Sequence, residues 1–295
     1  MEAESVEPTA LAVIIPAGPA DDVADTVASA VHFTSAPRFI VVIDDTGREV
    51  KEALEASSTD VHVIPAPAKA PGGHGGLWVK LAAGYRYALD NFAFDVVLRL
   101  DADALVIGNG IASSAAERFA TNGGLGMLGS YRLGYDGGHR DWEPAARILD
   151  RECGLRGIDR PRMRHILRTL RSIAVENGYV RGEHPLGGAY LHSKSAVHAI
   201  AERGWLELAP LRHSHLGEDH IFALLTRAAG FEIGDFAGPD DPMALEWRGL
   251  PASPAELLAR HKVVIHSVRF WGQLNEAEIR TAFAEARETN PDPSL

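Results

Sequence analysis

The sequence has a single cysteine, no long apolar run and an N-terminal stretch with no basic residue. Cys153 cannot form an intrachain disulfide, and no Cys/His zinc spacing can be built around it. No apolar run approaches the ~18 residues that span a bilayer, and residues 1–7 are acidic where a signal peptide is basic. These absences predict a cytoplasmic protein without a transmembrane segment.

The sequence also lacks an excess of basic residues. The 29 Lys and Arg stand against 40 Asp and Glu, which gives a formal net charge of −11. A protein that binds duplex nucleic acid needs a basic face, so nucleic acid is not an expected partner. An anionic small molecule stays compatible with this charge if acidic side chains hold a metal ion that binds it.

What the sequence does contain is the composition of a folded domain. Hydrophobic residues make up 46% and charged residues 23% of the 295 residues, which excludes a disordered or low-complexity chain. In the first half, short Val- and Ile-rich runs alternate with amphipathic helical stretches, the pattern of a mostly parallel α/β sheet. The predicted strands are Leu11–Ile15, Phe39–Ile43, Val61–Ile64, Val96–Leu100 and Leu125–Gly129, and the predicted helices are 20–33, 47–57, 76–91 and 110–121.

The regular alternation ends near residue 130. Residues 130–142 are expected to form a loop and 143–177 two helices, within a segment that carries nine Arg and four acids between Arg147 and Arg181. This basic segment is expected either to be a solvated helix pair with ion pairs or to recognise an anionic acceptor or cover a site. The later predicted elements are strands Ala189–His192, Phe231–Phe236 and Val263–Ser267 and helices Ser195–Arg203, Glu218–Ala229 and Glu276–Glu288, with a capping box at Asn275 and Glu278.

Several polar residues stand where strands or helices meet loops. Asp101 and Asp103 directly follow a buried strand, where α/β sheets bind ligands, and carboxylates suit Mg²⁺ or Mn²⁺. His266 closes another buried strand and would complete a metal site if the two strand ends converge; a packed histidine is the alternative. A solvated turn is the alternative for the two aspartates.

Two further motifs suit a nucleotide-handling enzyme. Glu218 and Asp219 begin an apolar helix, where they complement the helix dipole and where Asp219 could act as a general base. The Gly-rich segment 71–76 opens another helix and matches neither a dinucleotide nor a P-loop signature. Lys80, one turn into that helix, is a candidate phosphate ligand. Trp142, Trp247 and Trp271 are candidates for stacking on sugar rings or for ordinary packing.

Taken in order along residues 11–270, these motifs resemble a glycosyltransferase of the GT-A fold, similar to family 2. The resemblance implies a Rossmann-like, mostly parallel central sheet flanked by helices with a helical insertion. It treats 1–295 as one domain: a nucleotide-binding half at about 9–130, the helical insertion at 143–181 and an acceptor and metal half at 185–290. The second strand continues Asp-Asp-Thr-Gly and no Q-x-x-R-W signature is present, so polymer synthesis is not expected.

The resemblance also implies a donor, a cofactor and roles for residues. The donor is a nucleotide diphosphate sugar, the acceptor a small molecule or glycan, and the cofactor Mn²⁺ or Mg²⁺; a homo-oligomer is left open. The metal ligands would be Asp101, Asp103 and His266, and the catalytic pair Asp219, as base, with Glu218. The nucleotide and donor residues would be Pro16, Ala17, Asp44, Asp45, Lys80, Asp101, Ala102, Gly187 and Gly188.

Two other functions use the same kind of fold. A sugar-phosphate nucleotidyltransferase also combines metal-binding Asp with a Gly-rich loop, but the basic residue that usually follows its first strand is missing from Ile15 to Pro19. A non-catalytic nucleotide-sugar-binding protein would keep the fold without turnover. The enzyme is favoured by the intact set of Asp101, Asp103, Glu218, Asp219 and His266.

Overall fold

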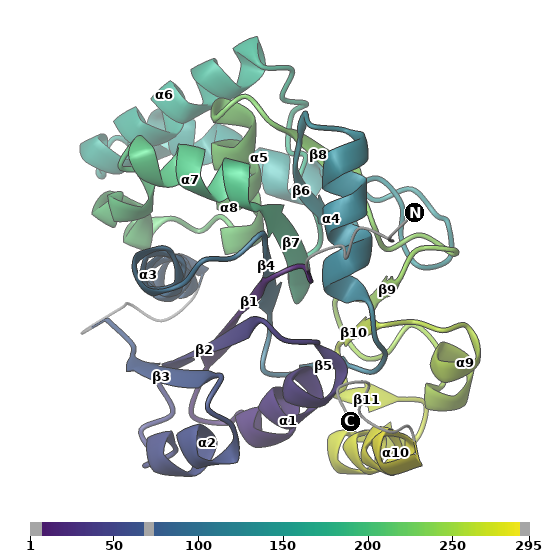
Figure 1. Cartoon of the computed structure of the whole chain (residues 1–295). Helices are drawn as coiled ribbons and strands as arrows, with labels where there is room; N and C mark the ends of the chain where they lie inside the picture. Colours follow the sequence, from purple (N-terminus) through teal and green to yellow (C-terminus); the bar gives the residue numbers. More distant parts are fainter. Residues whose placement is uncertain (1–7, 68–73, 290–295) are drawn as a thin grey trace, which may run out of the picture.

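The computed structural model describes residues 8–67 and 74–289, built around a seven-stranded sheet (Figure 1). The strand order is β3-β2-β1-β4-β7-β6-β8. β7 runs antiparallel to both its neighbours, and the other pairs are parallel. The strands are β1 (Leu11–Ala17), β2 (Arg38–Asp44), β3 (Val61–Pro65), β4 (Val96–Leu100), β6 (Leu125–Gly129), β7 (Ala189–Ser193) and β8 (Glu232–Asp235).

Helices cover both faces of this sheet because its strands are apolar on both sides. Along β1, Ala12 and Ile14 join one buried cluster, and the residues between and beside them join the other. One face carries α3 (His74–Asn91), α6 (Pro161–Glu176), α7 (Lys194–Glu202) and α8 (Glu218–Ala228), and the other carries α1 (Val23–Phe33), α2 (Lys51–Ser57) and α4 (Ile111–Thr121). The predicted α/β class, a mostly parallel sheet flanked by helices, is confirmed.

A second, three-stranded sheet lies beside the first. It has the order β5-β10-β9, with β10 antiparallel to β5 and parallel to β9. A third apolar cluster joins this sheet to two helices. The strands of this sheet are β5 (Ala104–Val106), β9 (Met243–Leu245) and β10 (Val264–His266), and the two helices are α9 (Pro254–Ala259) and α10 (Glu276–Thr289). A separate hairpin is formed by β11 (Phe270–Trp271) and β12 (Leu274–Asn275). This sheet brings the end of the chain to the segment after β4.

The basic segment folds as the sequence predicts, into α5 (Glu143–Cys153) and α6, which pack on each other. The capping box at the start of α10 is also present: the Asn275 and Glu278 side chains each accept a hydrogen bond from the other's backbone N–H, at 3.1 and 2.9 Å. Sequence patterns missed β9, α9 and the β11–β12 hairpin. Among the helices of residues 8–67 and 74–289, none combines the length and the hydropathy of a membrane-spanning segment.

Close packing of α3 on the sheet depends on Gly84. A Cβ at this position would lie 2.7 Å from Ile43 Cδ1 and 2.8 Å from Ile14 Cγ2. We therefore expect Gly84→Val to lower the free energy of unfolding by about 1–3 kcal/mol, since overpacking forces side chains from their rotamers. Urea denaturation followed by circular dichroism measures this. Ala83→Val, on the same helix but half-buried beside a cavity, is the control; an equal loss in both variants would contradict the packing argument.

Candidate metal and transfer site

The two sheets bring three metal-ligating side chains together. Asp101 and Asp103 lie between β4 and β5, and His266 ends β10, whose register places it opposite Ala104. The His266 Nε2 atom lies 3.3 Å from Asp103 Oδ1 and 3.8 Å from Asp101 Oδ2. One ligand atom from each of the three lies within 4.8 Å of the others. The predicted metal ligands therefore share one site.

Backbone contacts orient the imidazole of His266. Its Nδ1 lies 2.8 Å from the Glu246 carbonyl oxygen, which can only accept, so Nδ1 carries a proton and Nε2 faces the aspartates. Burial lowers the pKa of His266, but the hydrogen bond to Asp103 and the charges of both aspartates outweigh it and raise the pKa above its usual value. An Nε2 lone pair beside two carboxylates is a donor set that suits a divalent cation such as Mn²⁺.

A second layer of donors fixes Asp103. Its Oδ2 accepts hydrogen bonds from Ser267 Oγ at 3.0 Å and from Arg269 Nε at 2.9 Å, which leaves Oδ1 toward His266. Burial alone would raise the pKa of Asp103, but the contacts with His266 and Arg269 hold it well below its usual value. Asp103 is therefore ionised at neutral pH and available to a cation.

Gly187 and Gly188 lie between this triad and the start of α8. The Gly188 carbonyl accepts a hydrogen bond from Asp101 N at 2.7 Å, and Gly188 has φ +94°. A Cβ on Gly188 would overlap the His266 ring, and a Cβ on Gly187 would lie 3.1 Å from Asp219 Oδ2. The absence of side chains at both positions thus lets the histidine and Asp219 approach the same segment of backbone.

Arg99 links the two sides of the site, and sequence analysis did not select it. It belongs to β4, its side chain is 1% exposed, and its Nη2 lies 2.8 Å from Asp101 Oδ1 and 2.9 Å from Glu218 Oε1. A charged residue within an otherwise apolar strand is the signal that could have identified it, because a buried guanidinium needs carboxylate partners.

The two acids at the start of α8 differ in accessibility. Glu218 is buried against Arg99, whereas Asp219 is half-buried, with Oδ1 accepting from His220 N at 2.7 Å and Oδ2 toward Gly187. Burial, opposed by Arg99 and assisted by the charges of Asp219 and Asp101, raises the pKa of Glu218 to about 7. The geometry therefore favours Asp219 over Glu218 as the group that meets a substrate.

A cavity of about 370 Å³ opens onto the triad. Of the predicted donor residues, Pro16, Ala17, Lys80, Asp101 and Ala102 line it. Asp45 adjoins it through Lys80, at 2.5 Å. The other lining residues are Gly18, Asp21, Leu77, Asp103, Trp247, His266 and Arg269.

The remaining predicted residues lie outside the lining of this cavity. Asp44 Oδ1 accepts from the backbone and hydroxyl of Thr46, at 2.8 and 2.7 Å, and so holds a turn. Gly187, Gly188, Glu218 and Asp219 are joined to the cavity through Asp101 and Arg99. In the Gly-rich segment, 71–73 lie outside the described residues, and a Cβ on Gly75 would overlap the Arg212 carbonyl, which gives this glycine a packing role.

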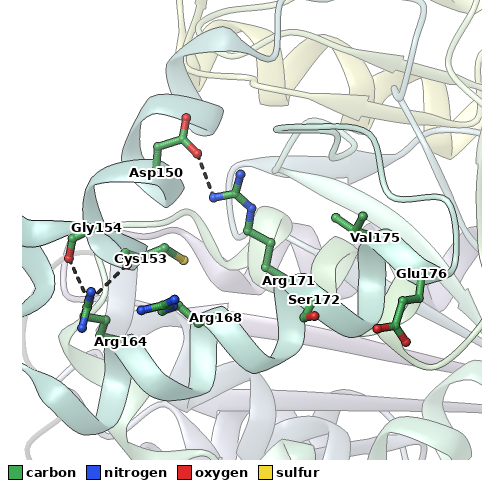
Figure 2. A pocket seen from close by; sticks show the side chains of 9 residues that line it. All are labelled: Asp150, Cys153, Gly154, Arg164, Arg168, Arg171, Ser172, Val175 and Glu176. Atoms are coloured by element: carbon green, nitrogen blue, oxygen red, sulfur yellow. Dashed lines mark hydrogen bonds and ion pairs between the residues drawn. The ribbon is translucent and has the colours of Figure 1, made fainter.

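Two larger cavities lie around the basic segment. One, of about 650 Å³, lies between α5 and α6 (Figure 2). Arg171 contacts Asp150 at 2.8 Å, and Arg164 donates to the carbonyl oxygens of Cys153 and Gly154. The other, of about 660 Å³, adjoins Arg160 and Arg212. Within the described part of the chain, the cluster able to hold a metal is Asp101, Asp103 and His266, so the smallest of these three cavities carries the clearest chemistry.

No protein-family model and no curated protein sequence matches this chain. A similar solved structure is that of glucosyl-3-phosphoglycerate synthase from Mycobacterium tuberculosis in complex with Mn²⁺, uridine diphosphate and glucosyl-3-phosphoglycerate. It is 14% identical, with a TM-score of 0.37 over 98% of this chain and 83% of that chain. At this level of similarity the assignment of the site rests on its own geometry, and membership of family 2 stays a prediction.

Gly188 provides a test of the metal site. We expect Gly188→Ala to displace the His266 ring and to weaken Mn²⁺ binding by about tenfold or more, as the loss of a contact that orients a metal ligand does. Calorimetric titration with Mn²⁺, after circular dichroism has shown that the variant folds, measures the affinity. Gly187→Ala, whose Cβ faces Asp219, should bind Mn²⁺ like the unmodified protein; equal affinity in all three proteins would rule out the assigned site.

Glu218 should make stability depend on pH. Its folded-state pKa, about 7, exceeds the unfolded value near 4.5, so in that range the folded state retains a proton that the unfolded state has lost. Stability from this group is therefore present below pH 4.5 and decreases as the pH rises toward 7. The free energy of unfolding of Glu218→Gln, minus that of the unmodified protein, should increase by roughly 1–3 kcal/mol from pH 5 to pH 8. Denaturation at both pH values, with a chelator present, measures it; a constant difference would contradict the raised pKa.

Proposed function

We propose that this protein is a metal-dependent glycosyltransferase of the GT-A type, which moves a sugar from a nucleotide diphosphate sugar to an acceptor hydroxyl. The observation that carries the proposal is the Asp101, Asp103 and His266 triad at the carboxyl end of β4, in one cavity with Pro16, Ala17 and Lys80. Ligands bind at this edge of open α/β sheets. The cavity has the carboxylates, the imidazole and the cationic side chains that a metal-bound diphosphate requires.

The chain's residues would divide the work of holding the donor. Asp103 and His266, with Asp101, would hold Mn²⁺ or Mg²⁺, which supplies Lewis-acid stabilisation of a leaving diphosphate. Lys80 and Arg269 line the same cavity and can donate to phosphate oxygens. Pro16, Ala17 and Asp45, at the ends of β1 and β2, would contact the nucleoside.

Asp219 would accept the proton of the acceptor hydroxyl. Its Oδ2 faces Gly187, whose missing side chain lets the carboxylate come close to the Gly187–Gly188 backbone beside the triad. As the hydroxyl oxygen bonds to the anomeric carbon and the diphosphate leaves with the electrons of the broken bond, the proton passes to the carboxylate. Attack from the face opposite the leaving group inverts the anomeric configuration. Gly188 would line the path between donor and acceptor.

The test is release of nucleoside diphosphate from a panel of nucleotide sugars with Mn²⁺, with and without candidate acceptors. The unmodified protein should release it. Asp103→Asn should lose at least 100-fold of this activity, because several kcal/mol of charge stabilisation are removed, and Asp219→Asn should lose about 10²–10⁴-fold. Asp90→Asn, an exposed acid with one long ion pair to Arg86, is the control and should retain full activity.

Three outcomes would overturn the proposal. Unchanged activity in Asp103→Asn would remove the metal site from the mechanism. Pyrophosphate release from a nucleoside triphosphate and a sugar phosphate would identify a nucleotidyltransferase. Tight binding of a nucleotide sugar with no hydrolysis or transfer, for every acceptor tested, would identify a binding protein.

A further inference from the structure

Trp247 is an exposed aromatic residue on the wall of the metal cavity. It follows β9 by two residues, lines the cavity with the triad, and is 69% exposed. Most other lining groups are carboxylates, cations or small residues, so the indole and Leu77 are the large apolar surfaces there. An indole left in water beside charged groups is poorly placed for stability and well placed to cover the apolar face of a ligand ring.

The backbone on both sides of Trp247 is tied to the strand that carries a metal ligand. Glu246 N donates to the His266 carbonyl at 2.8 Å, and Ser267 N donates to the Gly249 carbonyl at 3.1 Å, so both sides of Trp247 are tied to the segment that carries His266. The Arg248 guanidinium carbon lies 4.5 Å from the centroid of the Trp247 ring. This cation packs on the ring in a cation–π contact, and a side chain with such a contact loses less entropy on stacking than a free one.

The other two tryptophans that the sequence marked for stacking have different surroundings. Trp142 stacks on Tyr131, with ring centroids 5.1 Å apart, and its Nε1 donates to the Tyr131 carbonyl. Trp271 is exposed in the β11–β12 hairpin and does not line the cavity. Of these three residues, Trp247 alone combines exposure with a place in the site.

The strand order indicates which part of the donor Trp247 meets. Ala17 is the last residue of β1, and Asp45 directly follows β2. Trp247 instead follows β9, at the far edge of the sheet β5-β10-β9. Asp101 and Asp103 lie between β4 and β5, and these strands lie between β1 and β2 on one side and β9 on the other, as Figure 1 shows. A diphosphate held at the acidic pair, with its nucleoside toward β1 and β2, would direct the sugar toward Trp247.

We propose that Trp247 stacks against the ring of the sugar to be transferred, and so sets affinity for the sugar portion of the donor. This inference rests on the proposed function. The C–H face of a hexose ring packs on an indole, and such a contact adds binding energy without chemistry at the anomeric carbon. Trp247 is therefore a binding residue that should act on donor affinity more than on the rate of transfer.

The experiment compares nucleotide sugars with their nucleoside diphosphates. Dissociation constants for UDP-, ADP- and GDP-glucose and for UDP, ADP and GDP are measured by calorimetry with Mn²⁺ present. For the pair that the unmodified protein binds, Trp247→Ala should lower the affinity for the nucleotide sugar about 3- to 12-fold and change the affinity for the diphosphate less than 2-fold. Trp247→Phe should recover most of the affinity, and Trp271→Ala, the matched exposed tryptophan, should have none of these effects.

Two other results would overturn the inference and leave the proposed function intact. An equal loss of affinity for the nucleotide sugar and the diphosphate would place the indole on the nucleoside. Unchanged affinity for both would show that the indole does not contribute to donor binding. If the unmodified protein binds no nucleotide sugar and no diphosphate, the proposed function and this inference fail together. Circular dichroism of the exposed-site variant confirms that it is folded.

Discussion

The site depends on one buried cation. Arg99 lies within β4 with 1% of its side chain exposed, and the same Nη2 atom contacts Asp101, beside the metal ligands, and Glu218, at the start of α8. Its Nε and Nη1 have no hydrogen-bond partner among the described residues. Placing a guanidinium in the interior is expensive unless carboxylates surround it, and removing one partner of such a pair leaves an uncompensated charge. Arg99 therefore makes the position of α8 depend on that of Asp101, and Asp219 follows because it is the next residue in the helix.

The sequence predicted the first half of the fold well because each element there has a local signal. Buried parallel strands are continuous apolar runs, so Val96–Leu100 is found with the bounds that the structure gives. The small sheet was harder. β9 is three residues long and follows a loop of Gly, Pro and Asp, so no periodicity exists to detect. For α9 the sequence did hold a signal: a serine followed by a proline is typical of a capped helix start. In the structure, Ser253 Oγ accepts a hydrogen bond from Glu256 N, and Pro254 is the first helical residue.

In the site, too, residues with a local sequence signal were predicted and those without one were not. Asp101, Asp103 and His266 were predictable as polar residues at strand ends, and their convergence depended on β5 pairing with β10, a contact between residues about 160 positions apart that no local pattern encodes. The groups that orient them were not predictable. Glu246 acts through its carbonyl, so its side-chain type carries no information, and Arg269 lies in a segment without distinctive spacing. Local spacing gave no reason to separate Glu218 from Asp219. The resemblance named Asp219 as the base, and the burial of Glu218 against Arg99 supplies a physical reason for the difference.

The distribution of charge explains how an acidic chain can hold an anionic donor. The basic segment satisfies much of its own charge: Arg171 and Arg181 contact Asp150, and Arg181 and Arg147 contact Glu143. The metal cavity is lined by three carboxylates, Asp21, Asp101 and Asp103, and two permanent cations, Lys80 and Arg269. When His266 is a metal ligand it is neutral, so the lining itself then carries an excess of one negative charge, which a divalent ion reverses to the sign that a diphosphate requires. Because such linkage is reciprocal, a diphosphate that binds better with the ion present must also tighten the ion. The arrangement of acids thus favours donor and metal binding as a coupled pair.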